Sequence, residues 1–168
     1  MLAAGGWPIL ADDARPADPD NPRGYFEFDP VKRLRRDASW LGQAQGSAVK
    51  VVSYLLDALP SAYAYRVIFM ERSLDEILTS QRVMLARQGK EAGDDLLVRT
   101  SFEKHLHYIG AWIEGQTNMT VCRLRYAAVV ADPEAAARQL DAFLGGGLDV
   151  AAMATVVDPA LHRQRAEN

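Results

Sequence analysis

The sequence is poor in several features that would place it in a particular class of protein. Its 168 residues include one cysteine, Cys122, so no internal disulfide can form and nothing indicates an oxidising compartment. No apolar run approaches the ~18 residues of a membrane-spanning helix, and the first residues lack the basic and apolar stretches of a signal peptide. Positive charge is not in excess, because 19 Lys and Arg oppose 22 Asp and Glu to give a net charge of −3. We therefore expect a cytoplasmic protein that neither crosses a membrane nor binds nucleic acid in general.

What is present is the composition of an ordinary globular domain. Hydrophobic residues make up 49% and charged residues 24% of the chain, close to the averages for folded proteins. The length is that of one domain. Because the sequence shows neither an internal repeat nor a boundary, residues 1–168 are predicted to form a single domain.

Two buried strands are predicted where β-branched and aromatic residues gather, at 65–70 and 119–125. Helical periodicity predicts helices at 73–88, 94–114, 133–144 and 149–155. Shorter elements are expected as a strand at 48–52 and as helices at 31–40 and 54–59. Strands that alternate with helices predict an α/β fold with a parallel sheet.

The first six residues have the pattern of a helix end. Met1–Ala4 favours a helix, and Gly5 and Gly6 are typical of a helix C-terminus. Four residues are too few to nucleate a helix. The pattern therefore predicts the last turn of a helix whose earlier turns precede Met1, with a frayed terminus as the alternative.

The strand–turn–helix at 65–88 is the best candidate for a ligand site. In open α/β sheets, ligands bind at the carboxyl ends of the strands, and Arg72 follows the strand there. The start of the next helix offers unpaired N–H groups to an anion, and Ser80 lies two turns into that helix. An arginine can also bind a phosphate through two hydrogen bonds. The alternative is that Arg72 pairs with Asp75 or Glu76 at the surface and that Ser80 is merely solvated.

The segment Tyr65–Ser80 (YRVIFMERSLDEILTS) resembles the 3′-phosphate-binding segment of the sulfotransferases that use 3′-phosphoadenosine 5′-phosphosulfate (PAPS). In that family an apolar strand ends in Arg and a Ser follows eight residues later, which is the spacing of Arg72 and Ser80. Val121–Tyr126, Ala131–Glu134 and Phe143–Gly145 resemble the same family's late strand and the helix after it. Asn21–Glu27 and Leu161–Arg165 are similar to a bacterial branch of the family. The resemblance implies a P-loop-like parallel sheet flanked by helices. It also implies transfer of a sulfuryl group from PAPS to a small-molecule hydroxyl or amine acceptor, without a metal.

One departure from the family pattern concerns the phosphosulfate-binding loop, which the resemblance places just before Met1. The strand that carries this loop would lie between the strands at 65–70 and 119–125. We therefore expect these two strands to face a gap, and unpaired backbone groups there would each cost ~1–3 kcal/mol. The chain would then close its sheet differently, pair with a second copy as a homo-oligomer, or be only marginally stable. Because the loop that holds the transferring group is not in this sequence, we also expect the chain to lack sulfuryl-transfer activity.

A second departure concerns the general base that an acceptor hydroxyl requires. Val52 stands where many family members carry a catalytic histidine. We expect Glu27 to act instead, because its aromatic neighbours Tyr25, Phe26 and Phe28 would shield the carboxylate from water. The alternative is a surface carboxylate on a loop.

Other polar residues are given weaker roles. Lys50 interrupts an apolar segment and is expected to reach the donor, with an edge-strand lysine as the alternative. Arg163 and Arg165 resemble the C-terminal basic residues that approach the nucleotide phosphate in the family, with a disordered tail as the alternative. His105 and His107 are two residues apart on a helix, so they face different directions and are expected to be surface or packing residues rather than metal ligands.

Two other functions stay open at this point. The first alternative to a sulfotransferase is an inactive remnant that serves as a nucleotide-binding or interaction domain. The second is a relative of the P-loop kinases, which share the architecture. A Gly-x-x-x-x-Gly-Lys-Ser/Thr loop upstream would favour a kinase.

Overall fold

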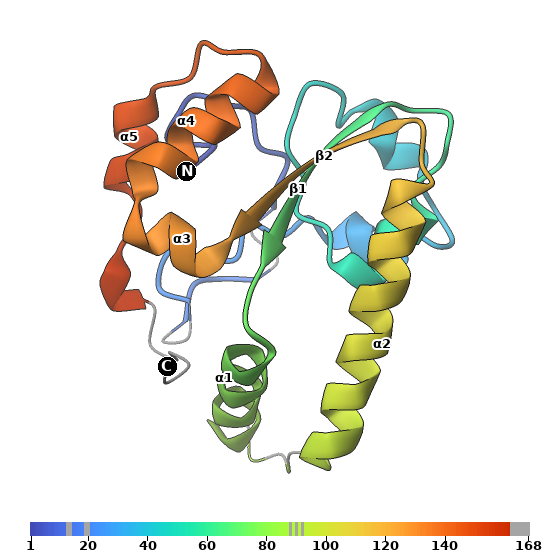
Figure 1. The fold of residues 1–168 in the computed structure, drawn as a ribbon. Helices are drawn as coiled ribbons and strands as arrows, with labels where there is room; N and C mark the ends of the chain where they lie inside the picture. The colour runs from blue at the N-terminus through green and yellow to red at the C-terminus, as the bar shows by residue number, and fades with distance from the viewer. Residues whose placement is uncertain (13–14, 19–20, 88, 90, 92, 162–168) are drawn as a thin grey trace.

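The computed structural model describes residues 1–12, 15–18, 21–87, 89, 91 and 93–161 (Figure 1). Its strands and α-helices, in chain order, are β1 (Tyr65–Glu71), α1 (Leu74–Arg87), α2 (Asp95–Glu114), β2 (Met119–Arg125), α3 (Tyr126–Ala131), α4 (Pro133–Leu144) and α5 (Val150–Thr155). Four 3-10 helices are η1 (Asp29–Arg33), η2 (Ser39–Gly42), η3 (Ser53–Ala58) and η4 (Pro159–Leu161). These elements confirm the α/β prediction, both buried strands and the helices predicted at 73–88, 94–114, 133–144 and 149–155, within one residue at each end. Within the described residues, no helix is both long and apolar enough to cross a membrane.

The two strands pair with each other directly and in parallel. The register runs without interruption from the pair Tyr65 and Met119 to the pair Glu71 and Arg125. The expected gap between these strands is therefore wrong for this structure. Direct pairing explains the difference, because the facing N–H and C=O groups of β1 and β2 satisfy one another.

Side chains alternate between the two faces of this sheet, and helices cover both (Figure 1). On one face, Val67 and Phe69 of β1 pack against a cluster that contains Ile109 of α2. On the other face, Cys122 of β2 belongs to the largest core cluster, together with residues of α4 and α5, among them Met153. In Figure 1, α2 runs antiparallel to the strands, so the start of α2 lies toward their carboxyl ends.

The part of the chain before β1 is mostly irregular, and two predictions fail there. The helix expected at 31–40 is two separate 3-10 helices, η1 and η2. Between them Arg35 pairs with Asp57 of η3, a residue outside its own segment. The strand expected at 48–52 is reduced to one parallel bridge between Ile9 and Ala48. Beyond the bridge the side chains still alternate between buried and exposed positions. Val49 and Val51 pack against a cluster of buried residues that includes Trp40 and Leu41, whereas Lys50 is exposed.

The first residues of the chain form a turn with the local geometry of a helix C-terminus, and the earlier helical turns expected before Met1 stay a prediction. Trp7 N–H donates to the carbonyl of Leu2 at 3.0 Å, and Gly6 N–H donates to the carbonyl of Ala3 at 3.2 Å. Gly6 has a left-handed backbone with φ of 87°, which glycine adopts at little cost. This pair of bonds is the pattern that closes an α-helix, and here it closes a single turn.

Candidate functional site

Arg72 lies at the carboxyl end of β1, where the sequence predicts an anion site. Its Nε donates to Oε2 of Glu76 at 2.8 Å, and Glu76 is buried with 7% of its surface exposed. The guanidinium carbon lies 4.9 Å from the ring centroid of Tyr126, the first residue of α3 after β2. Of the two acidic partners that the sequence left open, Arg72 therefore takes Glu76. An ion pair and a cation–π contact hold the cation at this edge of the sheet.

Ser80 lies one turn beyond Glu76 on the same helix, α1. Residues four apart share one face of a helix, so Ser80 and the carboxylate that holds Arg72 face the same way. Ser80 is half-buried. A common pocket for Arg72 and Ser80 stays a prediction, and the shared helix face is consistent with it.

Glu27, the base expected to act on the acceptor, and Lys50, the lysine expected to reach the donor, lie next to each other. The carboxylate Oε1 of Glu27 is 3.6 Å from Lys50 Nζ and 3.3 Å from Arg15 Nη1. Lys50 Nζ also donates to the carbonyl of Tyr25 at 3.1 Å, and the Arg15 guanidinium carbon lies 3.4 Å from the Tyr25 ring centroid. The carboxylate is thus surrounded by two cations as well as aromatic neighbours, which differs from the apolar setting that the sequence predicts.

The backbone beside this cluster is strained. Phe26 has a φ of 50°, a left-handed conformation that is rare for a bulky residue, and 54% of its surface is exposed. Backbone strain of this kind is found most often at functional sites. The strained turn places the aromatic ring of Phe26 in solvent between Tyr25 and Glu27.

Comparison with known proteins assigns the family. A family model described as "Sulfotransferase family" matches residues 13–149, more than half of the chain. The chain belongs to the sulfotransferase family. No curated protein and no solved structure matches this sulfotransferase-family chain.

The match includes every predicted site residue that the structure describes. Glu27, Lys50, Arg72 and Ser80 lie inside residues 13–149. Arg163 and Arg165, expected near the nucleotide phosphate, lie outside both the matched segment and the described residues.

The structure of this sulfotransferase-family protein adds a polar pair that the sequence analysis missed. His105 Nε2 lies 2.9 Å from Ser53 Oγ, and the imidazole stacks on Tyr54. Because 52 residues separate Ser53 from His105, no local spacing reveals the pair. His107, by contrast, is exposed on α2.

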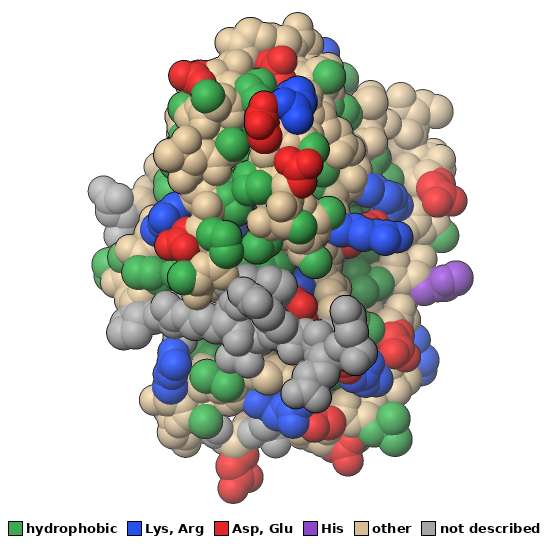
Figure 2. Space-filling view, turned by 60° about the vertical axis from the view of Figure 1, so that its left-hand side comes forward, with side chains coloured by type: hydrophobic (Ala, Val, Ile, Leu, Met, Phe, Trp, Pro, Cys, Tyr) green, Lys and Arg blue, Asp and Glu red, His purple; other side chains and the backbone are tan. Residues whose placement is uncertain are grey.

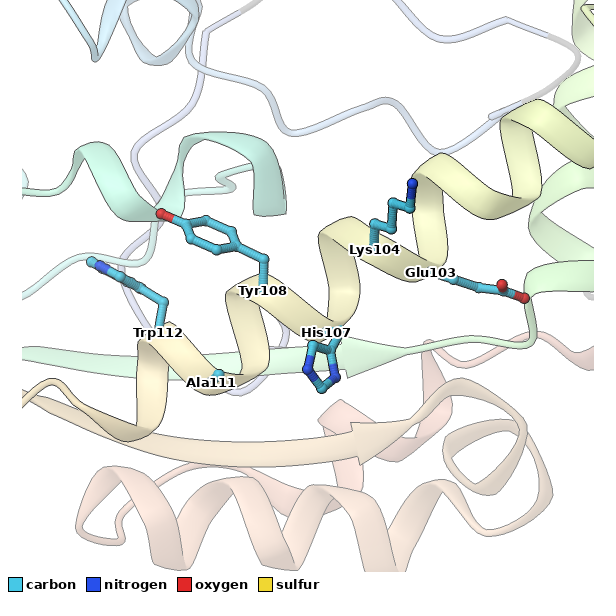
Figure 3. Close-up of a pocket in the computed structure, with 6 residues that line it drawn as sticks. All are labelled: Glu103, Lys104, His107, Tyr108, Ala111 and Trp112. Carbon is cyan, nitrogen blue, oxygen red and sulfur yellow. The ribbon is translucent and has the colours of Figure 1, made fainter.

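A shallow hollow of about 750 Å³ lies along α2 (Figure 3). Its lining consists of six residues of α2: Glu103, Lys104, His107, Tyr108, Ala111 and Trp112. Tyr108 reaches toward η3 and donates to Asp57 Oδ2 at 3.3 Å. None of the site residues predicted from the sequence lines this hollow, so we do not assign it to the donor or the acceptor.

Charges of both signs are interspersed on the face shown in Figure 2. Exposed arginines pair with carboxylates, either on another element, as Arg123 with Glu71, or along their own helix, as Arg138 with Glu134 on α4. Arg72 differs from these surface pairs because its partner Glu76 is buried.

Proposed function

We propose that this protein transfers a sulfuryl group from PAPS to the hydroxyl or amine group of a small acceptor, in place of the inactivity that the sequence analysis expects. The family match supports sulfuryl rather than phosphoryl transfer. The observation that carries the proposal is the position of Arg72, a cation held at the carboxyl end of β1 beside the N-terminus of α1. This is where an open α/β sheet binds an anionic ligand.

On the donor side, we assign Arg72 and Ser80 to the 3′-phosphate of the nucleotide. A guanidinium carries five N–H donors, so its bond to Glu76 is compatible with a phosphate contact. Ser80 would add a hydroxyl donor from the same face of α1. Arg163 and Arg165 would approach the nucleotide from the end of the chain.

At the sulfuryl group that moves from donor to acceptor, we assign Lys50 as the positively charged contact. Sulfuryl transfer, like phosphoryl transfer, requires positive charge near oxygens that gain negative charge in the transition state. The carboxylate of Glu27 and the carbonyl of Tyr25 hold the Lys50 ammonium group in place. Because Glu27 lies between two cations, orienting Lys50 is the role that its surroundings support better than that of a base.

The direct test is to incubate the protein with PAPS and a panel of phenols, alcohols and amines, and to measure products by mass spectrometry. We expect equal amounts of sulfated acceptor and adenosine 3′,5′-bisphosphate. Lys50→Ala should reduce the rate ~10²–10³-fold, as does the loss of one preorganised charge-stabilising donor. Lys32→Ala is the matched control, because Lys32 is also an exposed lysine paired with a carboxylate, Asp29.

Failure to sulfate any acceptor in the panel would contradict the proposal. Nucleotide binding without transfer would instead match an inactive nucleotide-binding domain. An equal loss of rate in Lys50→Ala and Lys32→Ala would remove the specific role of Lys50.

A further inference from the structure

Ser53 and His105 form a fixed hydrogen-bonded pair between η3 and α2. The Oγ and Nε2 atoms are 2.9 Å apart. The imidazole stacks on Tyr54, with ring centroids 3.6 Å apart and planes inclined by 11°, and Phe102 meets Tyr54 edge-on at 6.3 Å. A hydroxyl within hydrogen-bond reach of an oriented imidazole is an arrangement suited to proton transfer.

Ser53 lies close to Lys50 in the chain. His105 lies toward the carboxyl ends of the strands, where we propose that the ligands bind. Ser53 follows Lys50 by three residues, so at most ~11 Å of chain separates their Cα atoms. His105 lies one turn before Ile109, which belongs to the cluster that contains Phe69 of β1. Because α2 runs antiparallel to the strands (Figure 1), His105 is displaced from Ile109 toward their carboxyl ends.

Ser53 is also accessible from solvent. It is half-buried, and its chain neighbours Val52 and Tyr54 are 55% and 46% exposed. The exposed valine and tyrosine provide apolar surface on which an acceptor can rest. His105 is half-buried as well, so an acceptor can reach the hydroxyl while the imidazole is partly withdrawn from water.

The surroundings of His105 favour its neutral form. Desolvation lowers the pKa of His105, and the negative charge of Asp57 on η3 partly opposes that effect. Asp57 itself is bound by Arg35 at 2.6 Å and by the hydroxyl of Tyr108 at 3.3 Å. Asp57, Arg35, Tyr108 and the stacked Tyr54 are thus charged or titratable groups beside His105 on the elements packed around it. At neutral pH the imidazole keeps a lone pair that can accept a proton.

We propose that Ser53 and His105 relay the acceptor's proton, an assignment that rests on the proposed sulfuryl transfer. Ser53 Oγ accepts a hydrogen bond from the acceptor hydroxyl and donates its own proton to His105 Nε2. As the acceptor oxygen bonds to sulfur, its proton passes to Ser53 and the serine proton passes to the imidazole. The bond from sulfur to the nucleotide oxygen breaks, and adenosine 3′,5′-bisphosphate leaves with the electron pair. His105 then returns the proton to solvent.

Four variants test the relay. His105→Phe keeps a ring to stack on Tyr54 but removes the proton acceptor, and His107→Phe is its control at an exposed position on α2. Ser53→Ala removes the hydroxyl, whereas Ser53→Thr retains one. We expect kcat/KM to fall ~10²–10⁴-fold in His105→Phe and Ser53→Ala, the range for loss of general acid–base catalysis. Ser53→Thr should keep much of the activity, and His107→Phe should match the wild type.

The acidity of the acceptor separates proton transfer from a merely structural role. A phenol that is already ionised at the assay pH needs no proton acceptor, so His105→Phe should slow its sulfation only slightly. An alcohol should suffer the full loss. The kcat/KM of the wild type with the alcohol should fall as the pH drops through the pKa of His105, and this dependence should vanish in His105→Phe.

Histidine NMR provides a readout that does not require turnover. We expect His105 to titrate below the ordinary value of ~6.5, and an added alcohol acceptor to shift its resonances in the wild type but not in Ser53→Ala. If the wild type sulfates acceptors and His105→Phe equals it with alcohols and phenols alike, the relay is wrong and the proposed function stands. If the wild type sulfates nothing, both are wrong. A full loss of rate in Glu27→Gln, with His105→Phe active, would make Glu27 the base.

Discussion

Residues 1–64 and residues 65–161 of this sulfotransferase-family protein are stabilised in different ways. The later part holds every strand and α-helix of the described chain, and its core side chains Ala137 and Met153 are 0% exposed. In the earlier part, the described residues form three 3-10 helices and one bridge, and five buried side chains there, among them Trp40 and Leu41, form a separate cluster.

The helix ends show the same difference. Helices α2, α4 and α5 each begin after an aspartate whose side chain accepts a backbone N–H group. In the described structure, η1, η2 and η3 have no such side-chain cap. Helix α3 of the later part also lacks one. Arg72 is nevertheless bounded by two regular elements, β1 and α1, whereas Glu27, Lys50 and Ser53 lie on short turns and loops. Proteins commonly place variable chemistry on loops supported by a rigid scaffold, and here we expect acceptor choice to depend on the irregular part.

The largest effect on stability should come from the core of the later part. Met153→Ala removes a fully buried side chain and should lower the free energy of unfolding by about 2–5 kcal/mol. Met153→Leu nearly conserves volume and should cost less than about 1.5 kcal/mol. Urea unfolding measures both values. An equally small loss in the two variants would mean that Met153 does not anchor this core.

A smaller effect should arise where the first residues touch that core. A Cβ atom on Gly5 would lie 2.6 Å from Cγ and 2.7 Å from Sδ of Met153, so Gly5→Ala should cost about 1–3 kcal/mol through overpacking. Gly42→Ala is the control, because nothing lies within 4 Å of its added Cβ. The loss in Gly5→Ala should shrink in a Met153→Ala background, since contacting residues are not additive. An unchanged loss there would show that the two residues do not meet.

The capped helices offer a third comparison. Asp132 Oδ1 accepts the N–H of Ala135 at 2.9 Å at the start of α4. Asp132→Ala should lower the free energy of unfolding by about 0.5–2 kcal/mol, whereas Asp132→Asn should be nearly neutral, because asparagine caps as well as aspartate. Thermal unfolding of the two variants distinguishes them. Equal losses would indicate that charge, rather than capping, is what Asp132 contributes.

The smallest effect on the free energy of unfolding should be its dependence on pH, which arises from His105 where it bonds to Ser53 of the earlier part. Burial lowers the pKa of His105 in the folded state, so the unfolded chain binds a proton first as the pH falls. The contribution of His105 to the free energy of unfolding is therefore complete above pH ~6.5, the ordinary pKa of histidine. It declines as the pH drops from there through the pKa of His105 in the folded state. We expect urea unfolding between neutral and mildly acidic pH to show this slope, and His105→Phe to reduce it. A slope that His105→Phe leaves intact would place its origin elsewhere.

The sequence predicts the later part better than the earlier part for a physical reason. The strand at 65–70 and the long helices have strong periodicity and clear ends, such as Asp132 and Pro133 at the start of α4. Helix α3 was missed because its six residues, Tyr126–Ala131, follow β2 without a break and include two β-branched valines. Before β1, tertiary contacts decide the backbone, and among the described residues the segment Ala48–Val52 pairs with another segment only through the bridge between Ala48 and Ile9.

The same limit applies to the candidate site. Arg72 was predictable because its position at a strand end follows from local pattern. The proximity of Glu27 to Lys50 and of Ser53 to His105 depends on how distant segments pack, which no spacing in the sequence encodes.

The affinity for adenosine 3′,5′-bisphosphate tests the central claim, a nucleotide site at Arg72, most directly. Calorimetry should show binding by the wild type and a loss of ~10- to 150-fold in Arg72→Ala, which corresponds to the ~1.5–3 kcal/mol of a hydrogen bond to a charged group. Arg72→Lys, which keeps a cation beside Glu76, should lie between them, and circular dichroism checks that each variant is folded. Arg138→Ala should bind like the wild type, because Arg138 also pairs with a glutamate one turn away, but on α4. Equal affinity in all four proteins, or no binding by the wild type, would contradict the account.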